Sequence, residues 1–314
     1  MSNFLVTGGA GFIGSALVRG LVAGGADRVT VVDNLNSGFK SNLDDVGGPV
    51  DFRLIDIRDY DALRQAMDGV GIVFHEAAIP SVPRSIHDPI PSHDVNINGT
   101  FNVLRAAQEA GVRRVVYAAS SSAYGDTEVL PKVETMQANP RSPYAAQKLM
   151  GEYYMSVWTK CFGLDTVSLR YFNVYGPRQD PSSPYSGVLS LFMKAILERR
   201  SPTIFGDGEQ SRDFTYVEDV VALNIKAAQA PAKVVAGRVF NGGNGGRITL
   251  NQAWDLLQQI EEVRIPAHYG PAREGDVRDS QADVVAAARD LGHDPKFSFE
   301  DGMRATLDWY RKLK

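Results

Sequence analysis

A glycine-rich segment directly after the first apolar run places the tightest limit on how this chain can fold. Residues 4–6 (Phe-Leu-Val) lead into residues 7–14 (Thr-Gly-Gly-Ala-Gly-Phe-Ile-Gly), the order of a strand, a tight turn and a helix. Gly9, Gly11 and Gly14 fit the spacing G-x-G-x-x-G, and Gly8 starts a looser version of it. Glycines here let backbone N–H groups approach a pyrophosphate, which the helix N-terminus also attracts. The segment therefore predicts a dinucleotide-binding turn.

The second apolar run identifies which dinucleotide. Residues 29–32 (Val-Thr-Val-Val) end at Asp33, roughly 20 residues beyond the last glycine, where the acceptor for the adenosine ribose belongs. A carboxylate accepts a hydrogen bond from the ribose 2′-hydroxyl and repels a 2′-phosphate. Asp33 therefore predicts NAD, and not NADP, as the cofactor.

Apolar runs and amphipathic stretches alternate through the first half of the chain. We expect strands at 3–6, 29–33, 51–55, 72–76, 114–119 and 165–171, and helices at 12–24, 59–67, 91–110 and 143–161. This alternation predicts an α/β fold, a Rossmann-type doubly wound parallel sheet with helices on both faces. The pattern changes after about residue 172, and the remaining shorter elements predict a smaller mixed α/β substrate domain.

The expected domain limits follow from this change in pattern. Residues 1–172, with about 214–230, are assigned to the NAD-binding domain. Residues of about 173–213 and 231–314 are assigned to the smaller domain, including a strand near 238–241 and a helix near 283–291. A site is expected between the two domains, beyond the carboxyl ends of the parallel strands.

Composition excludes several other kinds of protein. The 314 residues carry a formal net charge of −4, and a basic face typical of nucleic-acid binders is not indicated. We find no signal peptide, no apolar stretch long enough to cross a bilayer and no pattern of metal ligands, so a cytoplasmic enzyme is expected. Cys161 is the one cysteine of the chain, which excludes an internal disulfide, and we expect it to be buried.

Polar residues after the fifth strand indicate the chemistry. That strand ends in Ser120-Ser121-Ser122, and a helix opens at Ser142-Pro143, an N-cap followed by proline. Tyr144 and Lys148 are four residues apart and so share a face of this helix. The lysine ammonium and an oxidised nicotinamide ring are expected to lower the phenol pKa from ~10 toward neutrality. Tyr144 can then act as a base for a sugar hydroxyl while NAD accepts hydride.

These motifs together resemble those of the extended short-chain dehydrogenase/reductase family. The match runs over essentially the whole chain and is strongest to UDP-sugar 4-epimerases, in particular the bacterial UDP-N-acetylglucosamine 4-epimerases. It includes residues 144–148 (Tyr-Ala-Ala-Gln-Lys), 169–173 (Leu-Arg-Tyr-Phe-Asn), 206–214 (Gly-Asp-Gly-Glu-Gln-Ser-Arg-Asp-Phe) and 273–276 (Arg-Glu-Gly-Asp). The resemblance implies that Ser120, Tyr144 and Lys148 are catalytic and that the protein is a homodimer, pairing through helices 91–110 and 143–161.

The resemblance also implies which residues bind NAD and the UDP-sugar. The implied NAD ligands are Gly8, Gly11, Phe12, Ile13, Gly14, Asp33, Asn34, Asp56, Ile57, Ala77, Ala78, Asn98, Tyr144, Lys148 and Tyr171. The implied substrate ligands are Ser81, Ser121, Ser122, Tyr144, Asn173, Gly187, Val188, Phe205, Arg212, Arg273, Asp276 and Ser280. Asn173, Arg212 and Arg273 match diphosphate ligands, Phe205 and Gly187-Val188 match the uracil subsite, and Asp276 matches a ribose ligand.

Two departures narrow the predicted reaction. Ser121 and Ser122 occupy positions where dehydratases and decarboxylases of the family carry acids. Ser280 stands at the gate beside the sugar C2 group, where galactose-type epimerases often carry a bulky residue. These residues favour a 4-epimerase that accepts N-acetylated as well as plain UDP-hexoses. A UDP-uronate epimerase, a dehydratase or a decarboxylase remains an alternative, as does a non-catalytic NAD-sensing regulator, which typically lacks the tyrosine or lysine.

Overall fold

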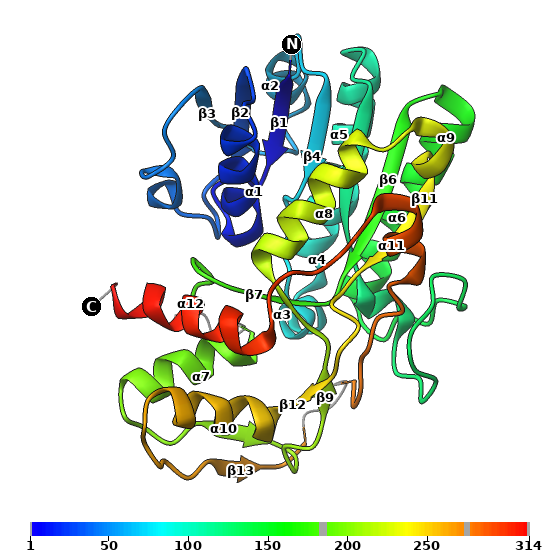
Figure 1. Ribbon diagram of the computed structural model, residues 1–314. Coiled ribbons are helices and arrows are strands. Elements are labelled where there is room, and N and C mark those ends of the chain that lie inside the picture. The colour runs from blue at the N-terminus through cyan, green and yellow to red at the C-terminus, as the bar shows by residue number, and fades with distance from the viewer. Residues whose placement is uncertain (1, 182–186, 273–276, 313–314) are drawn as a thin grey trace.

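The computed structural model describes residues 2–181, 187–272 and 277–312. Its centre is a sheet of seven parallel strands (Figure 1). In spatial order these strands are β11 (Arg238–Gly242), β6 (Asp165–Tyr171), β5 (Arg114–Ser120), β4 (Ile72–His75), β1 (Asn3–Thr7), β2 (Arg28–Asp33) and β3 (Val50–Leu54). All neighbours pair in parallel, and the strand order reverses beside β1. The predicted Rossmann-type doubly wound fold is confirmed.

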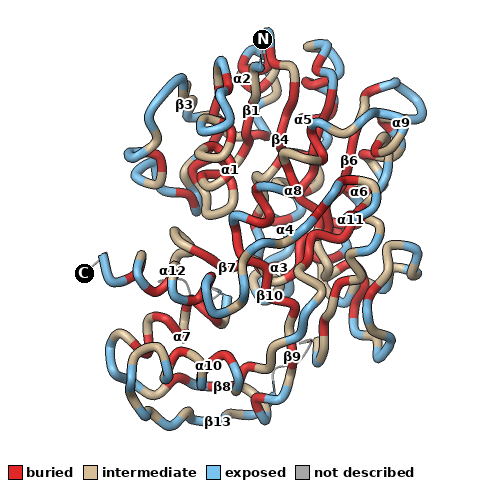
Figure 2. Tube along the Cα trace, in the orientation of Figure 1, coloured by how far each residue is buried: buried red, intermediate tan, exposed pale blue. Residues whose placement is uncertain are grey.

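Helices cover both faces of this sheet, which explains the apolar composition of the strands. On one face, α1 (Phe12–Ala23), α8 (Val217–Gln229) and α11 (Val285–Leu291) contribute to a core with Val6, Phe74 and Val167. On the other, α2 (Tyr60–Ala66), α5 (Thr100–Glu109) and α6 (Pro143–Phe162) pack over Leu5, Val73 and Val115. Figure 2 shows the buried strands at the centre of this sandwich.

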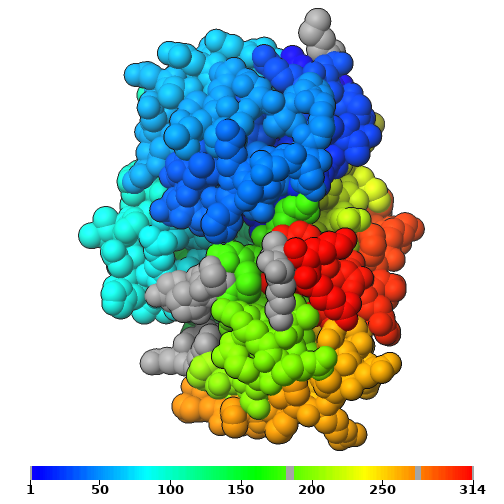
Figure 3. Space-filling view, turned by 90° about the vertical axis from the view of Figure 1, so that its left-hand side faces the viewer, coloured from blue at the N-terminus to red at the C-terminus, as the bar shows by residue number. Residues whose placement is uncertain are grey.

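A second core forms below the carboxyl edge of the sheet (Figure 1). It contains α7 (Val188–Leu197), α10 (Leu250–Ile260) and α12 (Phe299–Arg311). Three small strand pairs complete this region: β7 (Asn173–Tyr175) with β10 (Phe214–Tyr216), β8 (Thr203–Phe205) with β13 (His268–Gly270), and β9 (Ser211–Arg212) with β12 (Ile248–Thr249). Figure 3 shows the N-terminal part above this lower region.

The last part of the chain does not divide as predicted. The strand predicted near 238–241 is β11, which pairs with β6 in the main sheet. Ala287 and Leu291 of α11 belong to the core of the same sheet face. The prediction that places both elements in the smaller domain is therefore wrong, because position in the sequence does not reveal which sheet edge a returning strand joins.

Two local predictions also need correction. The helix predicted over 91–110 is divided into α4 (Pro89–His93), a π-helical segment from Asp94 to Gly99, and α5. Cys161, expected to be buried, is exposed near the end of α6.

The remaining short helical elements are α3 (Val82–His87), α9 (Ala232–Val235) and the 3₁₀ turns Lys40–Leu43 and Ser121–Tyr124. Within the described residues, no helix combines the length and apolar character needed to cross a membrane.

Candidate active site

The glycine turn between β1 and α1 is packed too closely for side chains. Gly8 has φ +69°, and a Cβ added there would lie 2.7 Å from the Ala77 backbone nitrogen. A Cβ on Gly14 would lie 2.1 Å from the Gly8 carbonyl oxygen. Helix α1 begins after Gly11 without a side-chain cap, so its first N–H groups remain available to a ligand. Phe12 and Ile13, two of the predicted NAD ligands, are the first residues of this helix. The turn therefore fits a dinucleotide pyrophosphate.

Asp33 is tied to the same turn. Its carboxylate accepts hydrogen bonds from the Ala10 N–H at 3.0 Å and the Leu35 N–H at 2.8 Å. Burial raises the pKa of Asp33, and these backbone hydrogen bonds act in the opposite direction. The interactions orient the carboxylate at the end of β2, beside the glycine turn.

The predicted adenine end contains a charged cluster. Asp56 accepts from Asn34 Nδ2 at 2.8 Å and pairs with Arg58 at 2.8 Å. The Arg58 guanidinium holds the pKa of Asp56 well below its usual range. Ile57 is buried against Gly99, where an added Cβ would lie 2.5 Å from Ile57 Cδ1. Asp56 is thus held ionised at the carboxyl side of β3.

The predicted catalytic residues meet at the carboxyl end of β5. Ser142 caps α6 by accepting from the Ala145 N–H, with Pro143 at the first helical position. This places Tyr144 and Lys148 on the turn nearest Ser120, whose Oγ accepts from Ser122 Oγ at 2.8 Å. Lys148 is buried, and its Nζ donates to the Ala118 carbonyl at 2.7 Å. Lys148 therefore bridges the first turns of α6 to β5.

The protein environment alone shifts the pKa of the Tyr144 phenol in the direction opposite to the shift predicted with NAD bound. Burial raises it to about 12, while a side-chain hydrogen bond with Ser120 acts in the opposite direction. The protein by itself therefore does not bring the phenol toward neutrality, because desolvation of the phenolate outweighs the help from its neighbours. A shift toward neutrality requires a further positive charge beside the ring.

Asn98, which is predicted to line the cofactor path, and its neighbour Asn96 lie in different surroundings. Asn98 is exposed and donates to Asp94 at 3.0 Å. Asn96 is instead buried: its Oδ1 accepts from the Ile79 N–H at 2.8 Å, and its Nδ2 donates to Gln147 on α6 at 2.9 Å. Residues two apart in a helical segment point in opposite directions, so Asn96 faces α6 and Asn98 faces solvent.

The segment after β4 lies between the glycine turn and α3. Ala77 and Ala78 are partly buried there, and the Ala77 N–H donates to Thr7 Oγ1 at 3.3 Å. Ser81 Oγ accepts from the Arg84 N–H and caps α3, so its hydroxyl already has a structural partner. His75, just before this segment, is buried between Thr7 and Thr100.

Several predicted substrate ligands lie in the region beyond the carboxyl edge. Asn173 is at the start of β7, and Arg212 lies in β9, with Nη1 donating to the Arg278 carbonyl at 2.8 Å. Phe205 ends β8, and Gly187-Val188 open α7. Ser121 and Ser122 follow β5 in a 3₁₀ turn. The predicted ligands Arg273 and Asp276 lie outside the described residues.

Ser280 is held close to Arg212 by backbone contacts. Its N–H donates to the Ser211 carbonyl at 3.1 Å, and its side chain is buried. Among the described residues, Ser280 Oγ has no hydrogen-bond partner. A buried hydroxyl without a partner is costly, so this atom is a candidate ligand contact.

Asp213 organises this region and was missed by the sequence analysis. It is fully buried, and its carboxylate accepts from the backbone N–H groups of Asn244, Gly245 and Ala282 at 2.8–3.0 Å. It thereby ties the Arg212 strand to the segment that carries Ser280. In the sequence, the position of Asp213 directly after the predicted phosphate ligand Arg212 could have indicated its importance.

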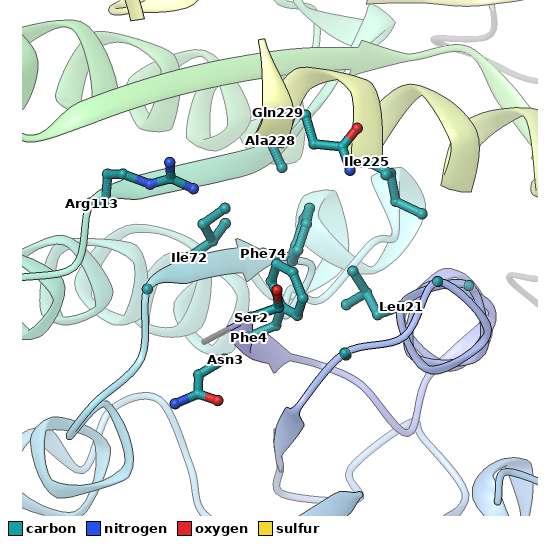
Figure 4. A pocket seen from close by; sticks show the side chains of 14 residues that line it. Ser2, Asn3, Phe4, Leu21, Ile72, Phe74, Arg113, Ile225, Ala228 and Gln229 are labelled. Carbon is teal, nitrogen blue, oxygen red and sulfur yellow. The ribbon is translucent and has the colours of Figure 1, made fainter. Parts of the chain in front are cut away.

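A cavity of about 240 Å³ lies at the opposite edge of the sheet (Figure 4). It is formed between α1, α8 and the amino ends of β1 and β4, with Phe4, Leu21, Phe74 and Ile225 in its wall and Arg113 beside it. Dinucleotides bind outside the carboxyl ends of parallel strands. This cavity is therefore separate from the site described above.

The arrangement defines a Rossmann-type enzyme with a Ser-Tyr-Lys centre beside a dinucleotide turn. Residues 4–243 match the model of the NAD dependent epimerase/dehydratase family. The chain belongs to this family, within the extended short-chain dehydrogenases/reductases, and its cofactor is NAD.

Individual relatives span several sugars. The chain is 38% identical to the UDP-glucose 4-epimerase of Mycolicibacterium smegmatis, covering 98% of both chains. It matches the structure of a UDP-N-acetylglucosamine 4-epimerase from Methanobrevibacter ruminantium, in complex with UDP-N-acetylmuramic acid, with a TM-score of 0.95, 36% identity, and coverage of 100% and 99%. It also matches a Bacillus cereus UDP-glucuronic acid 4-epimerase, with UDP-glucuronic acid and NAD, with a TM-score of 0.92, 31% identity, and coverage of 99% and 100%.

Proposed function

We propose that this protein is an NAD-dependent UDP-sugar 4-epimerase that interconverts UDP-GlcNAc and UDP-GalNAc, and also UDP-Glc and UDP-Gal, through a 4-keto intermediate. The observation that carries this proposal is the convergence of Ser120, Tyr144 and Lys148 at the carboxyl end of β5, where Lys148 donates to Ala118 and Ser120 hydrogen-bonds Tyr144. The neighbouring glycine turn and Asp33 supply the features that NAD needs.

In this proposal, the cofactor is held by groups along the carboxyl edge. The turn from Gly8 to Gly14 receives the pyrophosphate, Asp33 accepts from the adenosine ribose, and the cluster of Asp56 and Asn34 meets the adenine. When bound, NAD supplies reversible hydride transfer at C4 of the sugar. The positive charge of its oxidised ring is the additional charge that the Tyr144 phenol requires, since burial raises the pKa of that phenol to about 12.

The chain supplies the acid and base. The Tyr144 phenolate accepts the proton of the sugar 4-hydroxyl, and Ser120 hydrogen-bonds the same region and positions the hydroxyl. The Lys148 ammonium stabilises the phenolate electrostatically. The same phenol returns the proton after the ketone has turned over, while Asn173 and Arg212 keep the diphosphate anchored. The reaction needs no net oxidant, so we infer that NAD stays bound between turnovers.

Ser280 supports the preference for N-acetylated sugars. Its hydroxyl is small, buried and without a partner among the described residues, so a substrate group at this position gains a hydrogen bond and meets little steric resistance. In this proposal, the small side chain at this position leaves room for an acetamido group, and steric fit of this kind decides which sugars are admitted.

A panel of UDP-sugars tests the function. Purified protein is incubated without added NAD with UDP-GlcNAc, UDP-Glc and UDP-glucuronate, and the products are resolved as C4 epimers. We expect epimers of the first two and no loss of water or carbon dioxide, because Ser121 and Ser122 replace the acids of dehydratases and decarboxylases. Exclusive turnover of the uronate would replace the proposed substrate, and lack of any turnover would favour an NAD-sensing regulator.

We also propose a homodimer. Tyr153 and Val157 on α6 are 57% and 44% exposed, and Phe101 on the neighbouring α5 is 40% exposed. Met150 extends the same exposed face of α6. Apolar groups gathered on two adjacent helices are typical of a surface covered by another chain, and a second copy presenting the same face completes a four-helix bundle.

A further inference from the structure

Among the residues that the structure describes, no carboxylate forms an ion pair with the buried Lys148 ammonium. Lys148 is 4% exposed, its Nζ donates to the Ala118 carbonyl at 2.7 Å, and it lies 5.0 Å from the centre of the Tyr117 ring. A carbonyl and an aromatic face stabilise a cation only in part, and a buried charge without an opposite charge tends to become neutral. Burial lowers the pKa of Lys148 to about 8, and the carboxylates of Glu76 and Glu152 oppose that shift.

Glu152 is already committed to another cation. Its two carboxylate oxygens accept from Arg170 Nε at 2.9 Å and Arg170 Nη2 at 2.7 Å. Both side chains are buried, so this bidentate pair is held rigidly and is neutral overall. Glu152 therefore offers Lys148 little uncompensated negative charge.

Glu76 is placed differently. It directly follows β4, whose His75 pairs with Tyr117 of β5, so the next residues in register are Glu76 and Ala118, the residue whose carbonyl binds Lys148. The Glu76 carboxylate accepts from the Tyr171 hydroxyl at 2.7 Å, and Tyr171 in turn contacts Asn224 of α8. Among the described residues, Glu76 forms no ion pair within 4.0 Å.

We propose that Glu76 is a positioning residue for catalysis: its carboxylate, oriented by Tyr171, supplies the negative charge that keeps Lys148 protonated beside Tyr144. This inference rests on the proposed function for its catalytic consequence. Without Glu76, the lysine loses its proton at lower pH and no longer stabilises the Tyr144 phenolate. Glu76 therefore acts through Lys148 and needs no contact with the sugar.

The other titratable groups around the pair do not replace Glu76. His75 on β4 is buried between two threonines, and burial together with the Lys148 charge lowers its pKa to about 3, so it is neutral. Tyr117 on β5 and Tyr171 on β6 are fully protonated because burial raises their pKa values. Tyr144 and Glu152 are the other titratable groups of α6 near Lys148. Burial raises the pKa of Glu76 itself to about 7, so the carboxylate and the ammonium coexist near neutral pH.

The protonation of Lys148 tests the inference directly. Protein purified with its cofactor and labelled with ¹³C at lysine Cε is titrated by NMR, and the Lys148 signal is assigned by its loss in Lys148→Arg. In Glu76→Gln we expect the Lys148 pKa to fall by about one unit, the size typical of a lost neighbouring charge. Glu76→Asp, which keeps the charge, is expected to restore much of the difference. Glu209→Gln, at an exposed site, is the control.

Kinetics provide the second readout. The alkaline limb of kcat/KM is expected to move to lower pH in Glu76→Gln, with KM for the UDP-sugar unchanged at low pH, where Lys148 stays protonated. An unchanged Lys148 pKa in Glu76→Gln overturns the inference. If Glu76→Gln does not fold, Tyr171→Phe serves instead, because it removes the hydrogen bond that favours the ionised form of Glu76. The Lys148 pKa should then also fall, and an unchanged Lys148 pKa in Tyr171→Phe would overturn the inference. The NMR titration needs no substrate, so it tests the link between Glu76 and Lys148 even if the proposed epimerase activity is absent.

Discussion

In the proposed mechanism, Tyr144 needs the positive charge of the bound cofactor before it can act as a base, since burial raises its pKa to about 12. Replacing it with phenylalanine removes the oxygen and keeps the ring. We expect Tyr144→Phe to fold normally and to lose about 10²- to 10⁴-fold in turnover, the usual contribution of a positioned acid–base group. The rate of C4 epimer formation measures this loss. Tyr153→Phe, at an exposed tyrosine of the same helix, is the matched control and should stay active; near-normal turnover by Tyr144→Phe would remove this residue from the mechanism.

Ser280 carries the predicted sugar preference through its size. A tyrosine is much larger than the serine and would occupy the position proposed for the acetamido group, so Ser280→Tyr should suppress epimerisation of UDP-GlcNAc by about tenfold or more, the cost of misfit in a pocket, and spare UDP-Glc. Ser280→Ala keeps the space and should retain both activities. The ratio of kcat/KM values for the two sugars is the measurement. An unaltered ratio in the tyrosine variant would show that Ser280 does not gate the sugar.

At the scale of elements, the junction of β1 and α1 depends on backbone packing. A Cβ on Gly14 would lie 2.1 Å from the Gly8 carbonyl, so Gly14→Ala forces the helix away from the turn. We expect a loss of about 1–3 kcal/mol in stability, as for overpacking, and a lower NAD content. Denaturant unfolding and cofactor release after denaturation measure these. Gly47→Ala, where an added Cβ meets nothing within 4 Å, is the control and should change neither the stability nor the NAD content. Full NAD content in Gly14→Ala would contradict the proposed phosphate site.

At the scale of the whole molecule, α5 and α6 present the face proposed for the dimer. Val157→Glu places a charge at its centre, and a buried unpaired charge is strongly unfavourable. We expect the wild-type protein to have twice the chain mass in light scattering, and Val157→Glu to shift toward the monomer at equal concentration. Val129→Glu, at a valine that is 60% exposed in the loop before α6, should leave the mass unchanged. A monomeric wild type would refute the dimer.

Much of the sheet and of the candidate catalytic centre could be predicted from local sequence. Glycine spacing and Asp33 act within one strand-turn-helix unit, and Tyr144 and Lys148 share a helix face because of the helical repeat alone. Ser142 and Pro143 mark the start of α6, and the structure confirms that cap. The central strands β1, β2, β4 and β5 were predictable because each contains a run of mostly apolar, buried residues, as strands covered on both faces do. Each of these features depends on residues close together in the chain.

Only the tertiary structure decided features that depend on residues far apart in the chain. β11 joins the main sheet because it pairs with β6, about seventy residues earlier. Asn96 is inside and Asn98 outside because of how the π-helical segment is turned toward α6. The raised pKa of Tyr144 and the setting of Glu76 between Tyr171 and the Lys148 strand follow from burial, which sums contributions from many elements. Sequence by itself determined the fold class and the local motifs, whereas desolvation and long-range pairing, which exist only in the packed molecule, decided the electrostatics of the site.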